Sequence, residues 1–173
     1  FFVTGNHEYY WGAEECIEEF KRLGARVLLN EHVVLEEKVK KIVLAGVTDL
    51  KAHQIIPAHL SDPQKALQGA PNGTIKILLA HQPDSYSKAH EAGVDLQLSG
   101  HTHGGQFFPW SIAVMLAQRY YKGLNRHKNM WVYVSRGTGY WGPPLRFTVP
   151  AEVTLIRLIS SIEIDVHPEM AFT

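Results

Sequence analysis

Two histidines separated by a single residue give the first indication of chemistry in this sequence. His101 and His103 flank a threonine, and glycines lie on both sides of the group. On an extended backbone, side chains at i and i+2 point toward the same face. Two imidazoles placed in this way can share one metal ion or hold one ion each in a two-metal site. The glycines suit a backbone that turns sharply close to a ligand.

Two further polar stretches also follow apolar runs. The residues 4–8 come directly after Phe1 to Val3, and His81 follows the apolar run 75–80. In a layered α/β sheet the strand ends converge on one edge, where ligands bind. Neutral imidazoles and amide oxygens suit Zn, Fe, Mn and related ions. The candidate site residues at these strand ends are Asn6, His7, His81, His101 and His103.

The candidate ligands lack an obvious carboxylate. A two-metal hydrolytic site needs anionic ligands, usually including a bridging carboxylate. Asp49, after the apolar run that ends at Val47, is interpreted as a turn or capping residue rather than a ligand. Arg136, in the Gly- and Pro-rich stretch 135–144, fits either a phosphate contact or a local hydrogen-bond anchor. The sequence therefore predicts part of a two-metal site.

The elements that must position these residues alternate between strands and helices. A strand, a polar tip, a helix and a further strand occur in succession over 75–98, which indicates an α/β fold with parallel strands. Helices are expected at 12–23, 84–92 and 110–121, with a shorter one beginning near Pro63. Strands are expected at 1–3, 26–29, 32–37, 41–47, 75–80, 94–98, 130–134, 153–158 and 162–166.

The composition is that of an ordinary globular domain. The chain has 173 residues, of which 45% are hydrophobic and 20% are charged, and this length suits one domain. Lysines and arginines number 17, as do the acidic residues, so no overall basic field favours specific nucleic-acid binding. The single cysteine, Cys16, excludes an internal disulfide.

The apolar segment 107–117 contains Pro109 and is too short to span a bilayer. The interpretation we favour is a helix that packs on the sheet. The alternative is an apolar lip beside the site that touches a lipid-like substrate or a membrane surface.

Three blocks of this chain resemble signatures of a known family. Gly5-Asn6-His7-Glu8, the lone His81 and Gly100-His101-Thr102-His103 resemble, in order, the last three blocks of the calcineurin-like metallophosphoesterases. The additional runs 104–106 (GGQ) and 135–139 (SRGTG) are similar to the YaeI/YkuE-like bacterial subgroup, whose members are often membrane-associated. The resemblance implies an α/β fold, the four-layer αββα sandwich, with residues 1–173 as the C-terminal part of a single domain.

The resemblance also implies roles for individual residues. Asn6, His81 and His101 would bind one metal ion, and His103 the other. His7 would act as the acid or electrostatic partner of the leaving group, and Glu8 would orient its neighbours. The family's first two blocks, Asp-x-His and Gly-Asp-x-x-Asp, are absent. We therefore expect a chain that is incomplete at its N-terminus, with any targeting or membrane segment upstream.

The function implied is metal-dependent hydrolysis of phosphomonoesters or phosphodiesters, with two ions of Mn, Fe or Zn type and a metal-activated water. Lipid-linked or nucleotide substrates and a bacterial, membrane-associated or cytoplasmic location are the expectations. The chain alone is expected to bind at most one metal ion weakly and to show little activity. One alternative is a non-catalytic metal-binding or regulatory module. Another is a mononuclear site like that of cupins or carbonic anhydrases. Cupins have a glutamate shortly after the histidine pair, whereas here the next residues are Gly-Gly-Gln-Phe-Phe, which counts against this alternative.

Overall fold

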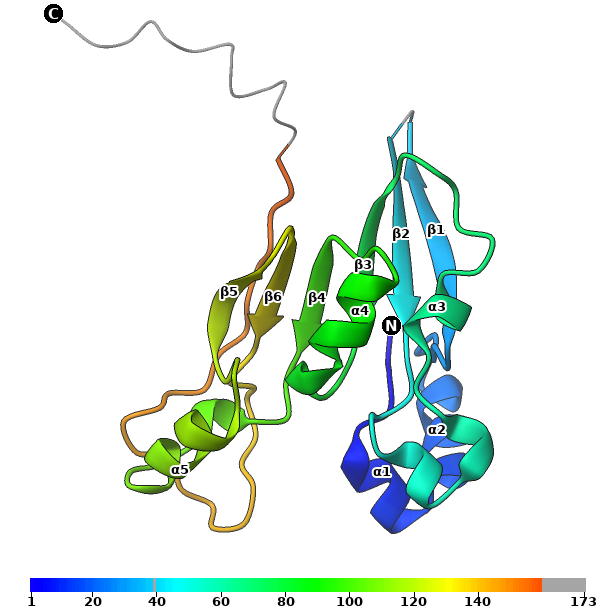
Figure 1. Ribbon diagram of the computed structural model, residues 1–173. Helices are drawn as coiled ribbons and strands as arrows, with labels where there is room; N and C mark the ends of the chain where they lie inside the picture. Colours follow the sequence, from blue (N-terminus) through cyan, green and yellow to red (C-terminus); the bar gives the residue numbers. More distant parts are fainter. Residues whose placement is uncertain (39, 160–173) are drawn as a thin grey trace, which may run out of the picture.

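A computed structural model describes residues 1–38 and 40–159, and its strands form one mixed sheet (Figure 1). The strand order is β1-β2-β3-β4-β6-β5. The four central strands β2, β3, β4 and β6 run parallel, and each outer strand pairs antiparallel with its neighbour. The expected α/β class is confirmed. The strands are β1 (Glu31–Glu37), β2 (Lys40–Gly46), β3 (Ile75–Leu79), β4 (Leu96–Ser99), β5 (Gly123–His127) and β6 (Met130–Val134).

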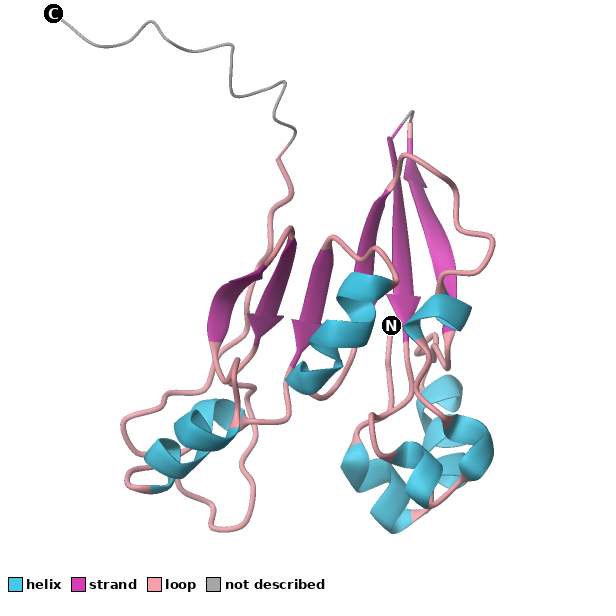
Figure 2. Cartoon of the chain, in the orientation of Figure 1, coloured by secondary structure: helices cyan, strands magenta, loops and turns pink. Residues whose placement is uncertain are grey.

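Short helices connect these strands. α3 and α4 lie against one face of the sheet, whereas α1, α2 and α5 lie at the end where the parallel strands finish (Figures 1 and 2). The α-helices are α1 (Asn6–Trp11), α2 (Ala13–Arg22), α3 (Pro63–Ala66), α4 (Tyr86–Glu91) and α5 (Trp110–Ala117). The 3₁₀ helices are η1 (Ala52–Gln54), η2 (Pro57–His59), η3 (Pro83–Ser85) and η4 (His103–Gly105).

The main hydrophobic core lies between the sheet and the helices α3 and α4. Alternate residues of β2 and its extension, Val43, Ala45 and Val47, are fully buried in this core, as the two-residue period of a strand requires. Leu44 points to the opposite face and joins a smaller cluster with Leu28. Burial on one face thus fixes the register of the parallel strands, and with it the positions of their ends.

Several predicted elements are confirmed. The hairpin forms with Glu31 opposite Gly46, and the helix expected at 12–23 is α2. The helix that starts at Pro63 is capped by Asp62, whose Oδ1 accepts a hydrogen bond from the Lys65 N–H at 2.9 Å. The helix expected at 84–92 begins with the 3₁₀ turn η3 before α4.

The prediction of strand 153–158 is wrong, and β5 was missed. Both edges of β6 are already paired, with β4 and β5, so residues 153–158 have no free edge there and form no ladder. β5 has the mostly polar sequence Gly-Leu-Asn-Arg-His, which lacks the apolar residues by which a strand is recognised from sequence. Lys128, in the turn between β5 and β6, has φ 53°, a left-handed conformation that is typical of two-residue hairpin turns. The strand expected at 162–166 lies outside the described residues.

The start of the chain and the segment 110–121 also differ from expectation. Residues 1–3 and 26–29 share only one isolated bridge, between Phe2 and Val27. Asn6 begins a helix rather than lying in a loop, because Gly5 and Glu8 cap α1. α5 ends at Ala117 and buries none of its residues, so it does not pack on the sheet as we favoured. Within the described residues, no helix is both long and apolar enough to cross a membrane.

Candidate metal centre

The parallel pairing of β3 and β4 brings two histidines side by side. His81 lies two residues beyond β3 and His101 two residues beyond β4. The pairing continues past the strands, since Gly100 N–H donates to the His81 carbonyl at 3.0 Å. His101 has φ 68° and His103 φ 51°, so the backbone turns through left-handed conformations at both. Such residues cluster at functional sites, where the surrounding structure holds them.

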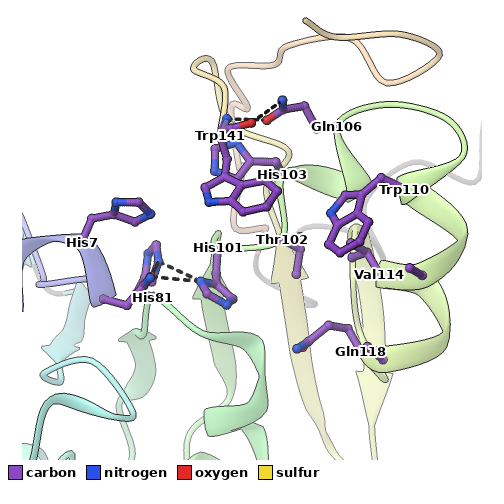
Figure 3. A pocket seen from close by; sticks show the side chains of 13 residues that line it. His7, His81, His101, Thr102, His103, Gln106, Trp110, Val114, Gln118 and Trp141 are labelled. Atoms are coloured by element: carbon purple, nitrogen blue, oxygen red, sulfur yellow. Dashed lines mark hydrogen bonds between the residues drawn. The ribbon is translucent and has the colours of Figure 1, made fainter. Parts of the chain in front are cut away.

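Asn6 completes a triangle of potential metal ligands with these two histidines. Asn6 Oδ1 lies 3.0 Å from His81 Nε2 and 3.2 Å from His101 Nδ1. The two imidazole nitrogens are themselves 3.2 Å apart (Figure 3). The expected convergence of these three side chains is therefore present in the structure.

The dimensions of the triangle fit a bound metal ion. Ligands that bind at about 2.1 Å on neighbouring corners of a tetrahedron or octahedron are roughly 3.0–3.4 Å apart. The three separations of 3.0, 3.2 and 3.2 Å lie in this range. Across residues 1–38 and 40–159, no three His, Cys, Asp or Glu side chains form a cluster that could hold a metal ion. The triangle differs from such a cluster because one of its corners is the amide oxygen of Asn6.

The electrostatic surroundings keep the histidines neutral. The pKa of His81 is lowered to about 4, chiefly by burial and also by the neighbouring His101, while Asp49 opposes the shift. Burial also lowers the pKa of His101 and of His103. A neutral imidazole has a free lone pair, which is the form that binds metals.

Gly5 and Glu8 position Asn6 and His81. The Gly5 N–H donates to Glu8 Oε2 at 2.6 Å, which fixes the first turn of α1. A Cβ atom on Gly5 would lie 2.9 Å from three atoms of the His81 ring. Only glycine therefore allows the ring to lie this close to the start of α1. Glu8 contacts the Gly5 N–H, and its role in orienting its neighbours stays a prediction.

Asp49 is buried close to the triangle, with 1% of its surface exposed. Both of its carboxylate oxygens accept from Gln82 Nε2 at 3.0 Å, and Oδ1 also accepts from Lys51 N–H at 2.9 Å. Gln82 directly follows His81. The carboxylate therefore ends a turn, as expected, and it also fixes the residue beside a potential ligand.

His103 and His7 line the same cavity without contacting the triangle through a hydrogen bond (Figure 3). Arg146 Nη2 lies 3.4 Å from His103 Nδ1 and donates to the Arg136 carbonyl at 2.7 Å. His7 is exposed, and its ring meets Tyr10 edge to face. That His103 serves a different metal ion from the other three side chains stays a prediction.

Arg136 lies away from the cavity. Its guanidinium forms an ion pair with Glu152, whose Oε1 accepts from the Arg136 N–H at 3.0 Å. Glu152 Oε1 also accepts from the Tyr133 hydroxyl at 2.7 Å. This geometry corresponds to the local anchor rather than to the phosphate contact.

The cavity itself has a volume of about 390 Å³. One end is formed by the polar residues at the strand ends, and the other by α5 and the loop that carries Trp141 (Figure 3). The sequence reasoning assigned no role to Gln106, Trp141 or Arg146. Gln106 lies three residues after His103, in the run 104–106 that the family resemblance includes, whereas the other two are brought in by tertiary folding. The lining residues outside the strand ends are Gln106, Trp110, Ala113, Val114, Ala117, Gln118 and Trp141.

Comparison with known proteins gives close relatives, although no protein-family model matches the chain. An uncharacterized metallophosphoesterase of Helicobacter pylori is 44% identical over 164 residues, which are 92% of this chain and 42% of that protein. The phosphodiesterase YaeI of Escherichia coli is 32% identical, over 92% of this chain and 58% of that protein. The chain belongs to the calcineurin-like metallophosphoesterase family.

A solved structure agrees at the level of the fold. The SoxB sulfate thiohydrolase of Thermus thermophilus superposes with a TM-score of 0.53 at 17% identity, over 76% of this chain and 27% of that chain. The present metallophosphoesterase chain thus spans about two fifths of the H. pylori relative and under three fifths of YaeI.

Proposed function

We propose that this chain carries part of a dinuclear metal centre that hydrolyses phosphoester bonds. The observation that supports this function best is the triangle formed by Asn6, His81 and His101, which has the dimensions of a metal site. His103 would contribute to the second ion, and carboxylate ligands would come from residues outside this chain. Ions of Mn, Fe or Zn type suit these donors.

In this proposal the residues of the chain bind the metal ions, keep the ligands in position and protonate the departing ester oxygen. Metal ions held here would supply polarisation of the phosphoryl group and a more acidic water. His7, exposed at the cavity, would in its imidazolium form donate a proton to the departing ester oxygen and become a neutral imidazole, a contribution of about 10²–10⁴-fold for a positioned acid. Glu8 and Gly5 keep the start of α1 in place, so that Asn6 and His7 face the cavity together.

Metal titration tests the first part of the proposal. Isothermal titration of the chain with Mn²⁺ or Zn²⁺ is expected to show one weakly bound ion, and His101→Ala is expected to abolish its binding. His53→Ala, which changes an exposed histidine outside the cavity, is the matched control. Equal binding by His101→Ala and the unmodified chain would sink the proposal.

Hydrolysis is tested on the product of the uninterrupted reading frame that contains this chain. Bis(p-nitrophenyl) phosphate and p-nitrophenyl phosphate with Mn²⁺ distinguish diester from monoester activity, and His7→Ala is expected to lower the rate by at least about 100-fold while metal binding persists. The alternative function, a metal-binding or regulatory module, is favoured by the amide corner and the lack of a carboxylate in the triangle. It predicts one ion per chain and no hydrolysis even with excess metal.

A further inference from the structure

α5 presents an apolar stripe to the cavity instead of to a protein core. Four of its residues recur at i, i+3, i+4 and i+7, which places them on one helix face. All four line the cavity, and none is buried. They are Trp110, Ala113, Val114 and Ala117. An apolar helix face that lies open beside a polar centre leaves apolar surface in contact with water unless a ligand covers it.

Trp141 extends this apolar wall from a different segment. Its indole stacks on that of Trp110, with centroids 6.0 Å apart and planes inclined by 21°. Figure 3 shows both indoles on the side of the cavity opposite His7 and His81. A pair of stacked indoles offers a broad, flat apolar surface, and aromatic ligands gain from offset stacking on such surfaces.

Gln106 holds Trp141 in place. Its side chain is almost fully buried, with 1% exposed, and bonds the backbone of Trp141 from both sides. Gln106 Oε1 accepts from the Trp141 N–H at 2.5 Å, while Nε2 donates to the Trp141 carbonyl at 2.8 Å and to the Pro143 carbonyl at 3.2 Å. A buried amide that satisfies three backbone groups is costly to replace.

The two glycines before Gln106 allow this wall to approach the histidines. A Cβ on Gly105 would lie 2.4 Å from the Ser111 Cα in the first turn of α5, and one on Gly104 would lie 2.6 Å from the Arg136 Cγ. Both glycines also have a positive φ, 61° at Gly104 and 83° at Gly105. The run Gly104-Gly105-Gln106 thus builds an apolar wall next to the metal-binding side chains.

We propose that this wall is a specificity subsite for an apolar, preferably aromatic, substituent of the phosphoester substrate. The inference rests on the proposed function, because it assumes that the phosphoryl group binds at the His81–His101 end. From there, a substituent attached to the phosphate extends along α5 toward Trp110 and Trp141. Small side chains at Ala113 and Ala117 leave the room for it.

Ligand titration of the Mn²⁺-loaded chain tests the subsite. 1-Naphthyl phosphate is expected to bind about tenfold or more tightly than inorganic phosphate and to quench tryptophan fluorescence. Octyl phosphate, the straight-chain probe, is expected to gain less. A larger gain with octyl phosphate would overturn the role given to the indoles, and equal binding of all three probes would overturn the subsite.

A pair of variants on α5 distinguishes binding at the subsite from non-specific hydrophobic binding to the helix. Val114→Gln is expected to remove most of the naphthyl gain, whereas Leu116→Gln on the opposite face, where Leu116 is 80% exposed, is expected to leave it unchanged. Neither position is buried, so both variants should fold. Equal effects of the two would contradict the inference. Loss of binding by inorganic phosphate and naphthyl phosphate alike would instead refute the proposed function.

Discussion

Asp49 is a buried carboxylate near the three side chains that we propose as metal ligands. Its carboxylate opposes the lowering of the pKa of His81 and of His101, which shows that its field reaches both rings. Gln82 connects it physically to His81, because the amide of Gln82 donates to both carboxylate oxygens. Residues that hold metal ligands in place change metal affinity by about 10–100-fold. Asp49 fits such a role without being a ligand.

Asp49→Asn is therefore expected to weaken Mn²⁺ or Zn²⁺ binding by about tenfold. The variant keeps the shape of the side chain but loses the charge and one acceptor oxygen, so unfolding by urea should also require about 1–3 kcal/mol less. Titration calorimetry and urea unfolding measure the two effects. Asp95→Asn is the control, since exposed Asp95 accepts a hydrogen bond from the Lys76 N–H and lies at the end of β4 opposite to His101. Unchanged metal affinity in Asp49→Asn would exclude the role.

The convergence of Asn6, His81 and His101 could be predicted from the sequence because parallel strands end at one edge. The nearly continuous apolar run 75–80 predicts the strand before His81, and the alternating run 94–98 predicts the strand before His101. The contact of Asp49 with Gln82 could not be predicted, since 33 residues separate the two and only the packed sheet brings them together. Arg136 was ambiguous for the same reason, because its partner Glu152 lies 16 residues further on.

At the scale of elements, the first turn of α1 and the end of β3 meet at a single glycine. Gly5 has φ −102° and ψ −176°, an extended conformation that any residue can adopt. The obstacle to a side chain is the ring of His81 alone, at 2.9 Å. This contact determines how closely Asn6 approaches His81, and so the size of the donor triangle.

Gly5→Ala should displace the His81 ring and weaken metal binding by at least tenfold, with little change in secondary structure. Gly100→Ala is the matched control next to His101, because a Cβ at Gly100 meets nothing within 4 Å. We expect Gly100→Ala to bind metal within about twofold of the unmodified chain. Metal titration together with circular dichroism checks both variants. Similar metal affinities for Gly5→Ala and Gly100→Ala would show that the close approach of Gly5 to the His81 ring does not affect metal binding.

Element boundaries were less predictable than element types. α2 and the β1–β2 hairpin follow strong periodic patterns and were predicted correctly. α5 was expected to pack on the sheet, yet it lies beside η4 instead, where Ser111 closely contacts Gly105. An apolar sequence indicates that a helix has a nonpolar environment, but not whether that environment is a core or a ligand cavity.

At the scale of the whole molecule, the edge where the parallel strands end is flanked by α1 on one side and α5 on the other (Figure 1). The histidines lie between these helices, so burial of their rings depends on the whole arrangement rather than on one strand. Burial of neutral imidazoles has a consequence for folding. Any condition that protonates them in the unfolded chain favours unfolding.

The metal-free chain should therefore lose stability as the pH falls from about 6.5 toward 4. The pKa of His81 is about 4 in the folded chain, below the value of about 6.5 expected when unfolded. Between these values the unfolded chain binds a proton that the folded chain excludes, so the free energy of unfolding is greatest above pH 6.5 and decreases below it. The lowered pKa values of His101 and His103 act in the same direction.

Urea midpoints measured with EDTA at pH 7.5, 6.0 and 5.0 check this expectation, since most carboxylates stay ionised over that range. His81→Asn removes the titrating ring and should make the decrease shallower, whereas His53→Asn, at an exposed position, should leave its slope unchanged. A midpoint that does not vary with pH would contradict the burial of neutral histidines. Saturating Zn²⁺ should raise the midpoint most at pH 7.5, because protons compete with the metal for the same nitrogens at lower pH.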